Sequence, residues 1–246
     1  MGVEVVTGRR FRSAAITHPG ARRKHNEDAY VDRPDLGIWA VADGAGGHAA
    51  GEVASGMIAE ALQAIPSGLS AAELLAEVRL ALERTHMALR EEAARRGPDE
   101  IVASTVVVML ARGDHFACLW AGDSRAYLLR DGTLRQITRD HSLVQELLEA
   151  GAIGPEEVQN HPRGNVITRA VGAELDEFLL DKVSDRLLPG DRFLLCSDGL
   201  CKTLPETELA SLLAAIDGAP PQALVDAALS ANVSDNVTAV TVEFTG

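Results

Sequence analysis

Four aspartates stand where apolar stretches of the sequence end or begin. Asp43, Asp123 and Asp198 each follow an apolar run, and Asp235 comes just before one. An ionised carboxylate at the end of a buried strand is costly, by several kcal/mol, unless it meets a cation. Arginine side chains could neutralise any one of these acids, but four acids with the same need favour bound metal ions.

The chemical type of these side chains indicates which metal they would bind. Carboxylate oxygens select hard ions such as Mg²⁺ and Mn²⁺, whereas zinc sites use imidazole and thiolate ligands. The seven histidines include no H-x-x-x-H pair, and the three cysteines include no C-x-x-C pair. Two hard ions held roughly 3.5–4 Å apart by shared carboxylates would activate a water molecule and clamp a phosphoryl group. The acids therefore predict the chemistry of phosphate-ester hydrolysis.

A glycine-rich loop follows the first of these acids and allows two interpretations. Gly44, Gly46 and Ala49 satisfy the dinucleotide-binding pattern G-x-G-x-x-A. That pattern needs a second parallel strand soon after the next helix, whereas two helical segments follow here, and Asp43 would repel a pyrophosphate. We favour a loop whose backbone approaches a cation, with the Gly44 carbonyl as a ligand beside Asp43. A tight turn in which Asp43 caps the following helix is the alternative.

The hydrophobic periodicity predicts the elements that would position these residues. Strands are predicted at 11–17, 28–32, 37–42, 101–110, 115–122, 125–130, 133–138, 178–184, 191–197 and 236–244. Helices are predicted at 49–65, 70–96, 205–215 and 221–231, with a helical and then loop-like segment at 141–164. The short central strands, joined by tight turns, are typical of antiparallel hairpins. We predict an α+β fold in a single domain over residues 1–246.

Composition limits the classes of partner. The net charge of −13 argues against nucleic acid, which binds to basic surfaces. The N-terminal stretch lacks the apolar core of a signal peptide, and no run approaches the roughly 18 apolar residues of a membrane span. Nothing resembles a coiled-coil seam. We expect a cytoplasmic protein that acts as a monomer, without nucleic acid or a membrane.

Eight motifs occur in the order that is found in one known family. The motifs are RKHNEDAY (23–30), VADGAGGH (41–48), ASTVVV (103–108), AGDSRAYL (121–128), TRDHSLVQ (138–145), NHPRGNVITRAVG (160–172), CSDGL (196–200) and SDNVTAV (234–240). With these motifs the chain resembles the metal-dependent serine/threonine phosphatases of the PP2C (PPM) family, and among them the short bacterial members. The resemblance covers nearly the whole chain, and although each motif alone is weak, eight in order are specific.

The resemblance implies a four-layer α-β-β-α sandwich, with two central antiparallel sheets flanked by helices and a metal centre at one end. Asp43 would bridge two ions of Mg²⁺ or Mn²⁺, and the Gly44 carbonyl would complete one site. Asp198 and Asp235 would hold the other ion. Asp123 resembles the acid that, with the counterpart of Asp198, binds a third and weaker ion in bacterial members.

Three further residues would serve the water molecules and the substrate. By the same resemblance, Glu27 and Asp28 would orient metal-bound waters, and Arg23 would receive the substrate phosphate. A forked, permanently charged guanidinium suits bidentate phosphate binding. The segment at about 142–165 resembles the variable flap beside the catalytic cleft, which would shape substrate choice.

One position departs from the animal-type members of the family. They carry a histidine directly after the Asp-Gly pair, proposed to protonate the leaving alkoxide, where this chain has Ala45. Metal-bound water, His48 and His141 are the alternatives for the proton donor. Because bacterial members commonly lack that histidine too, the change does not imply a loss of activity.

These observations predict a protein phosphatase that hydrolyses phosphoserine and phosphothreonine by direct attack of a metal-bridging hydroxide. Its partners would be phosphorylated proteins and an opposing serine/threonine kinase. The alternative from another class is a catalytically inactive relative that binds phosphoproteins as a regulatory module. A phosphatase of small molecules is the third possibility.

Overall fold

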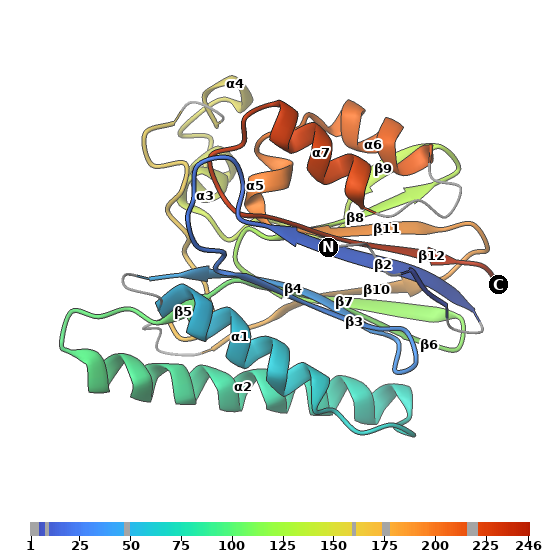
Figure 1. The fold of residues 1–246 in the computed structure, drawn as a ribbon, viewed down its shortest axis with the longest axis horizontal. Helices are drawn as coiled ribbons and strands as arrows, with labels where there is room; N and C mark the ends of the chain where they lie inside the picture. The colour runs from blue at the N-terminus through green and yellow to red at the C-terminus, as the bar shows by residue number, and fades with distance from the viewer. Residues whose placement is uncertain (1–4, 8–9, 47–49, 159–160, 174–177, 216–220) are drawn as a thin grey trace.

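The computed structural model describes residues 5–7, 10–46, 50–158, 161–173, 178–215 and 221–246. Two antiparallel sheets stack face to face, and helices cover the outer face of each sheet (Figure 1). This arrangement confirms the predicted four-layer α-β-β-α sandwich.

The first sheet joins strands from the two ends of the chain. Its order is β1-β2-β12-β11-β8-β9, with every neighbouring pair antiparallel. Strand β12 therefore lies between β2 and β11, so that residues far apart in sequence end side by side. The bounds are β1 (Val5–Thr7), β2 (Phe11–His18), β8 (Arg125–Arg130), β9 (Thr133–Gln136), β11 (Arg192–Cys196) and β12 (Val237–Phe244).

The second sheet contains two hairpins, β3–β4 and β6–β7. Its order is β10-β7-β6-β4-β3, and the short strand β5 pairs with the end of β4. The predicted succession of antiparallel hairpins is therefore divided between the sheets, because β8 and β9 pair in the first sheet. The bounds are β3 (Asp28–Arg33), β4 (Ile38–Ala45), β5 (Ala103–Ser104), β6 (Val106–Arg112), β7 (His115–Ala121) and β10 (Asp181–Arg186).

The helices cover the two outer faces and one end. Helices α1 and α2 pack on the second sheet, and α6 and α7 pack on the first (Figure 1). Helices α3 and α4 belong to the segment predicted as a flap and lie at the same end of the sandwich as α5. The bounds are α1 (Ala50–Gln63), α2 (Ala71–Arg96), α3 (Leu143–Glu149), α4 (Pro155–Val158), α5 (Asp198–Cys201), α6 (Glu206–Ala214) and α7 (Gln222–Ser230).

Strand β4 shows why this fold needs continuous apolar runs. Successive side chains of a strand point to opposite faces of the sheet. Ile38, Ala40 and Ala42 accordingly join the core beneath α1 and α2. Trp39 and Val41 join the core between the two sheets. Because both faces are buried, the run carries no polar alternation, and a charge appears only where the strand reaches the end of the sandwich.

The structure corrects three details of the predicted elements. Strand β1 was not predicted, and the expected strand at 101–110 is divided at Thr105 into β5 and β6. The expected strand at 178–184 begins only at Asp181, because Phe178 instead stacks on His86 with ring centroids 4.6 Å apart. The predicted start of the first helix, at residue 49, lies outside the described residues.

Candidate metal centre

The hairpin of β3 and β4 brings two predicted site residues face to face. Asp28 and Asp43 are directly paired in the antiparallel register of these strands. Beyond this pair the backbone N–H of Gly44 donates to the carbonyl of Glu27 over 3.1 Å. Four of the predicted site residues thus lie against one another at the same end of the second sheet because of the register of one hairpin.

The first sheet supplies the opposing wall of the site. Asp198 opens α5 directly after β11, and Asp235 precedes β12. The two sheets are joined through Asp28, whose Oδ2 accepts hydrogen bonds from Ser197 Oγ at 2.8 Å and Thr238 Oγ1 at 2.6 Å. The hydrogen bonds orient the Asp28 carboxylate, and they tie the starts of α5 and β12 to the hairpin of the other sheet.

Gly44 is required by close packing and not by its backbone angles. A Cβ atom at this position would lie 2.1 Å from the carbonyl oxygen of Gly51 and 2.7 Å from that of Glu27. At Gly51, in α1, an added Cβ would lie 2.9 Å from the carboxyl carbon of Glu27. The glycines therefore let α1 and the end of β4 close on the Glu27 carboxyl group, which leaves the backbone of Gly44 open to a close approach.

The acids of the site are close enough to repel one another. Burial raises the pKa of Asp43 well above its ordinary value, and the carboxylates of Asp28, Asp198, Asp123 and Asp235 raise it further. The pKa of Asp28 is raised from 3.8 to about 7, chiefly by burial, although its hydrogen bonds from Thr238 and Ser197 oppose the shift. Acids that are distant in sequence thus share one electrostatic environment, in which a divalent cation would be stabilised.

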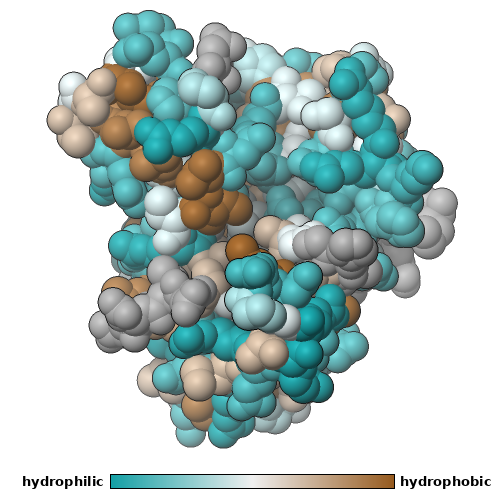
Figure 2. All heavy atoms as spheres, turned by 90° about the vertical axis from the view of Figure 1, so that its left-hand side faces the viewer, coloured by the Kyte–Doolittle hydropathy of each residue, from teal (hydrophilic) through white to brown (hydrophobic). Residues whose placement is uncertain are grey.

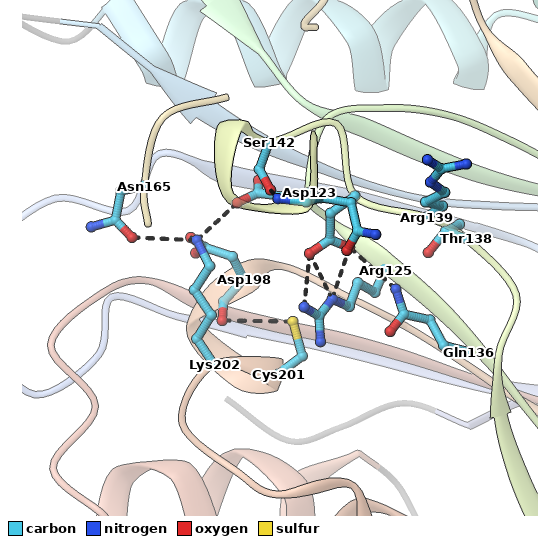
Figure 3. Close-up of polar contacts among 12 residues, drawn as sticks. Asp123, Arg125, Gln136, Thr138, Arg139, Ser142, Asn165, Asp198, Cys201 and Lys202 are labelled. Carbon is cyan, nitrogen blue, oxygen red and sulfur yellow. Dashed lines mark hydrogen bonds and ion pairs between the residues drawn. The ribbon is translucent and has the colours of Figure 1, made fainter. Parts of the chain in front are cut away.

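Basic side chains are partners of some of these acids but not of others. Lys202 Nζ lies 2.8 Å from Asp123 Oδ2 and 2.7 Å from Asp198 Oδ2 (Figure 3). Arg23 Nη2 lies 3.0 Å from Asp235 Oδ2, and both of these side chains are largely exposed. Asp43 has no ion pair within the part of the chain that the structure describes. Neutralisation by basic residues, the alternative to metal binding, therefore holds for the outer acids and fails for the central one.

The donor set fits hard divalent ions, although the carboxylates do not form a closed cage. Among the described residues, no three histidine, cysteine, aspartate or glutamate side chains converge tightly enough to hold an ion. The outer acids instead contact basic side chains, Asp123 and Asp198 at Lys202 and Asp235 at Arg23. Two buried oxygens of the site, Asp28 Oδ1 and Asp123 Oδ1, have no hydrogen-bond partner in the described structure. Oxygen donors that are buried without a partner are suited to a cation.

A cleft of about 790 Å³ opens beside these acids. Asp123, Asp198 and Asp235 line it from the sandwich, and Ser142, Val144 and Asn165 line it from the predicted flap. The view on to this end of the molecule shows a hollow bordered mainly by hydrophilic residues, with apolar residues gathered on its left side (Figure 2). Residues of the segment predicted as a flap thus line the cleft beside these acids.

Several supporting residues were missed by the sequence analysis. Asn236 accepts from the backbone N–H of Glu27 at 2.9 Å and donates to the carbonyls of Pro19 and His25, so it fixes the loop that carries Arg23. Lys202 could have been suspected from its spacing, because residues four apart on a helical turn lie on one side. The roles of Ser197 and Thr238 had no signal in the sequence, since hydroxyl residues in strands are common.

The structure assigns His141 a supporting position. Its ring is buried against Trp120, its Nδ1 accepts from the backbone N–H of Gly122 at 3.1 Å, and its Nε2 lies 3.3 Å from Asp181 Oδ2. Burial lowers the pKa of this imidazole. Nδ1 therefore holds the turn that carries Asp123, and Nε2 contacts the start of β10. His48, the other histidine considered as a proton donor, lies outside the described residues.

None of the helices in the described part of the chain combines the length and the hydropathy that a bilayer crossing requires.

Comparison with known proteins gives this centre its context. The family model for protein phosphatase 2C matches residues 20–231. The serine/threonine protein phosphatase PstP of Mycobacterium tuberculosis is 38% identical over 232 residues, which are 94% of this chain and 44% of PstP. The chain therefore spans less than half the length of that relative. The serine/threonine phosphatase stp of Listeria monocytogenes is 35% identical over 240 residues, covering 92% of this chain and 93% of the relative.

Solved structures of similar proteins have the same fold, and one of them contains two manganese ions. PppA, described as a key regulatory component of T6SS in Pseudomonas aeruginosa, has a TM-score of 0.88 and 44% identity, over 96% of this chain and 98% of that one. The catalytic domain of PstP, in complex with two manganese ions, has a TM-score of 0.86 and 34% identity, over 96% and 99%. The combined matches in sequence and in fold show that the chain belongs to the protein phosphatase 2C family, whose members depend on Mn²⁺ or Mg²⁺.

Proposed function

We propose that this chain is a Mg²⁺- or Mn²⁺-dependent phosphatase that removes phosphate from phosphoserine and phosphothreonine in proteins. The observation that carries the proposal is the group of mutually repelling carboxylates around Asp43. Asp43 itself forms no ion pair with a basic side chain among the described residues. The outer carboxylates of this group line a polar cleft, and the similar proteins are named serine/threonine phosphatases. Both observations support a phosphorylated substrate.

Four groups would hold the two ions. They are the carboxylate of Asp43, which would bridge the two ions, the carbonyl of Gly44, and the carboxylates of Asp198 and Asp235. When bound, the ions supply Lewis acidity for the phosphoryl oxygens and lower the pKa of a water molecule, so that it can attack phosphorus at neutral pH. The free Oδ1 of Asp28 supports its role as an acceptor that orients water, and the Glu27 carboxyl beside Gly51 is placed for the same role.

Arg23 would bind the substrate phosphate. Its guanidinium is largely exposed at the edge of the centre and pairs with Asp235 through one nitrogen at 3.0 Å. A guanidinium can form two parallel hydrogen bonds to a phosphate, which is geometrically better than the single bond to the carboxylate. A bound phosphate would therefore replace Asp235 as the partner of Arg23, and the carboxylate of Asp235 would be free to bind an ion.

The presence of every acid that the family resemblance requires supports catalysis over a binding module without activity. Purified protein should hydrolyse p-nitrophenyl phosphate with Mn²⁺, lose this activity in excess chelator and regain it when Mn²⁺ is restored. Persistent hydrolysis in chelator would contradict the metal requirement, and an inert protein in Mn²⁺ would favour the binding module. Turnover of phosphopeptides compared with sugar phosphates then separates a protein phosphatase from a small-molecule phosphatase.

The proposal extends to the setting of the enzyme. A serine/threonine kinase must supply the phosphorylated proteins, and we place both activities in the cytoplasm, with the phosphatase acting as a monomer in one domain. Size-exclusion chromatography with light scattering tests the oligomeric state directly.

A further inference from the structure

One edge of the centre already holds a cation of the chain itself. The ammonium group of Lys202 lies 2.8 Å from Asp123 Oδ2, 2.7 Å from Asp198 Oδ2 and 3.4 Å from Asn165 Oδ1 (Figure 3). An ammonium group has three donors. Here three oxygens, from the turn before β8, from α5 and from the flap, surround it. The arrangement is therefore a built position for a single positive charge and not a loose surface contact.

The backbone fixes this position. Lys202 follows α5, and its N–H donates to the carbonyl of Asp198 at 2.8 Å, which sets the two side chains one helical turn apart on the same side. The side chain of Lys202 is two-thirds buried, and that of Asp123 is only 2% exposed. A buried carboxylate needs a cation beside it, and Lys202 is the one that the fold supplies.

The neighbouring arginine does not compete for this role. Arg125, two residues after Asp123, is turned toward Asp140, with contacts of 2.9 Å from Nε and 2.7 Å from Nη2. The central acids differ again, because Asp28 and Asp43 form no ion pair with a lysine or arginine among the described residues. Within the part of the chain that the structure describes, a fixed cation is thus supplied for the pair Asp123 and Asp198 and none for the pair Asp28 and Asp43.

We propose that Lys202 takes the place of a third metal ion between Asp123 and Asp198, so that this enzyme works with two ions and a built-in ammonium group. The inference rests on the proposed two-ion function. It replaces the expectation that Asp123 is a metal ligand. One consequence is that the positive charge between Asp123 and Asp198 does not depend on the concentration of Mn²⁺. Another is that the contact of Lys202 with Asn165 joins the flap to the metal centre.

The test counts bound ions by a method that does not depend on activity. The free Mn²⁺ signal in electron paramagnetic resonance, followed in a titration to millimolar Mn²⁺, gives the number of ions bound per chain. The parent protein should bind about two ions. Lys202→Met, which keeps the length of the side chain but not its charge, should bind one ion more. Lys202→Arg, the matched control, keeps the charge and should bind the same number as the parent.

A second variant guards against an effect of misfolding. Asp123→Asn combined with Lys202→Met removes the most buried charge of the pair together with its cation, so it should fold and should lose the additional ion. Circular dichroism and thermal unfolding in chelator establish that each variant is folded. In crystals soaked in Mn²⁺, anomalous density should appear between Asp123 and Asp198 in Lys202→Met and be replaced by the ammonium group in the parent.

The outcomes separate the inference from the function on which it rests. The difference of one ion between Lys202→Met and the parent tests the inference, whereas the number bound by the parent tests the two-ion function. An equal count in the two proteins overturns the inference, and so does anomalous density between Asp123 and Asp198 in the parent. A parent that binds no ion overturns the proposed function. Even then, the difference in bound ions between Lys202→Met and the parent tests the role of Lys202.

Discussion

The two ends of β11 each carry a buried or half-buried aspartate in a different setting. Asp191, just before the strand, is 1% exposed and receives three bonds: 2.7 Å from Arg130 Nε, 2.7 Å from Arg130 Nη2, and 2.8 Å from the backbone N–H of Leu188. Asp198, just after the strand, faces the repelling acids around Asp43 at the other end. A buried aspartate is therefore no sign of a metal site by itself. The sign is a group of acids that the protein leaves without enough cations.

The largest effect is expected from Asp43→Asn. Loss of the bridging carboxylate removes the shared ligand of both ions, so kcat/KM for p-nitrophenyl phosphate with Mn²⁺ should fall by about 1,000-fold or more. Without metal the variant should be at least as stable as the parent, because a repelling charge is gone. Steady-state kinetics and chemical unfolding in chelator measure the two quantities. Activity within tenfold of the parent would contradict the central role of Asp43.

Asp191→Asn should have the opposite effects, a loss of stability with little loss of activity. Removal of the Asp191 charge leaves Arg130 with only its longer contact, 3.7 Å to Asp185 Oδ2, and the loss of one partner from this largely buried ion pair should cost about 3 kcal/mol of stability. For a chain of this size, the midpoint of thermal unfolding should fall by about 10 °C. Catalysis at 25 °C should be nearly unchanged, since the pair lies at the far end of β11 from the centre. A variant that retains its stability but loses its activity would refute the contrast between the two ends.

The pH dependence of stability sharpens the same comparison. Since burial raises the pKa of Asp28 to about 7, its neutral form is the one that the fold favours. Its contribution to stability is therefore present below about pH 4 and is lost as the pH rises through about 7. In chelator, Asp28→Asn should become more stable relative to the parent over this range, by a few kcal/mol.

Bound Mn²⁺ should reverse that trend. Metal binding requires ionised acids and releases their protons, so the stabilisation by Mn²⁺ should increase from pH 5 to pH 7.5. Urea unfolding of the parent and of Asp28→Asn at several pH values, with and without Mn²⁺, measures both trends. A difference between the two proteins that does not change with pH in chelator would show that Asp28 is ionised throughout.

The smallest effect is expected at the exposed edge of the centre. Arg23→Met should lower kcat/KM by about tenfold, mainly through a higher KM, because one charge-assisted contact to phosphate is lost. Its Mn²⁺ stoichiometry should equal that of the parent. Arg22→Met, at an exposed position next to it, is the matched control and should behave as the parent does. A reduced number of bound ions in Arg23→Met would show instead that Arg23 organises the metal ligands.

Local patterns in the sequence predicted most of the strands and helices. The apolar run at 38–42 predicted a largely buried strand, and the turn residues between the central strands predicted hairpins. These signals depend on periodicity and on turn chemistry, which act over a few residues. Strand β1 escaped prediction because it has only three residues, although it pairs with the neighbouring β2. The interruption at Thr105 escaped prediction because β5 pairs with the end of β4, which is distant in sequence.

The sequence by itself determined which acids stand at the ends of buried strands, and through the family motifs it determined what chemistry they serve. Only the tertiary structure decided which partner each acid has: Ser197 and Thr238 for Asp28, Lys202 for Asp123, and no cation among the described residues for Asp43. The reason is physical. Apolar periodicity is a property of short segments, whereas the pairing of charges depends on strand register and on the meeting of two sheets, which bring together residues about 200 positions apart.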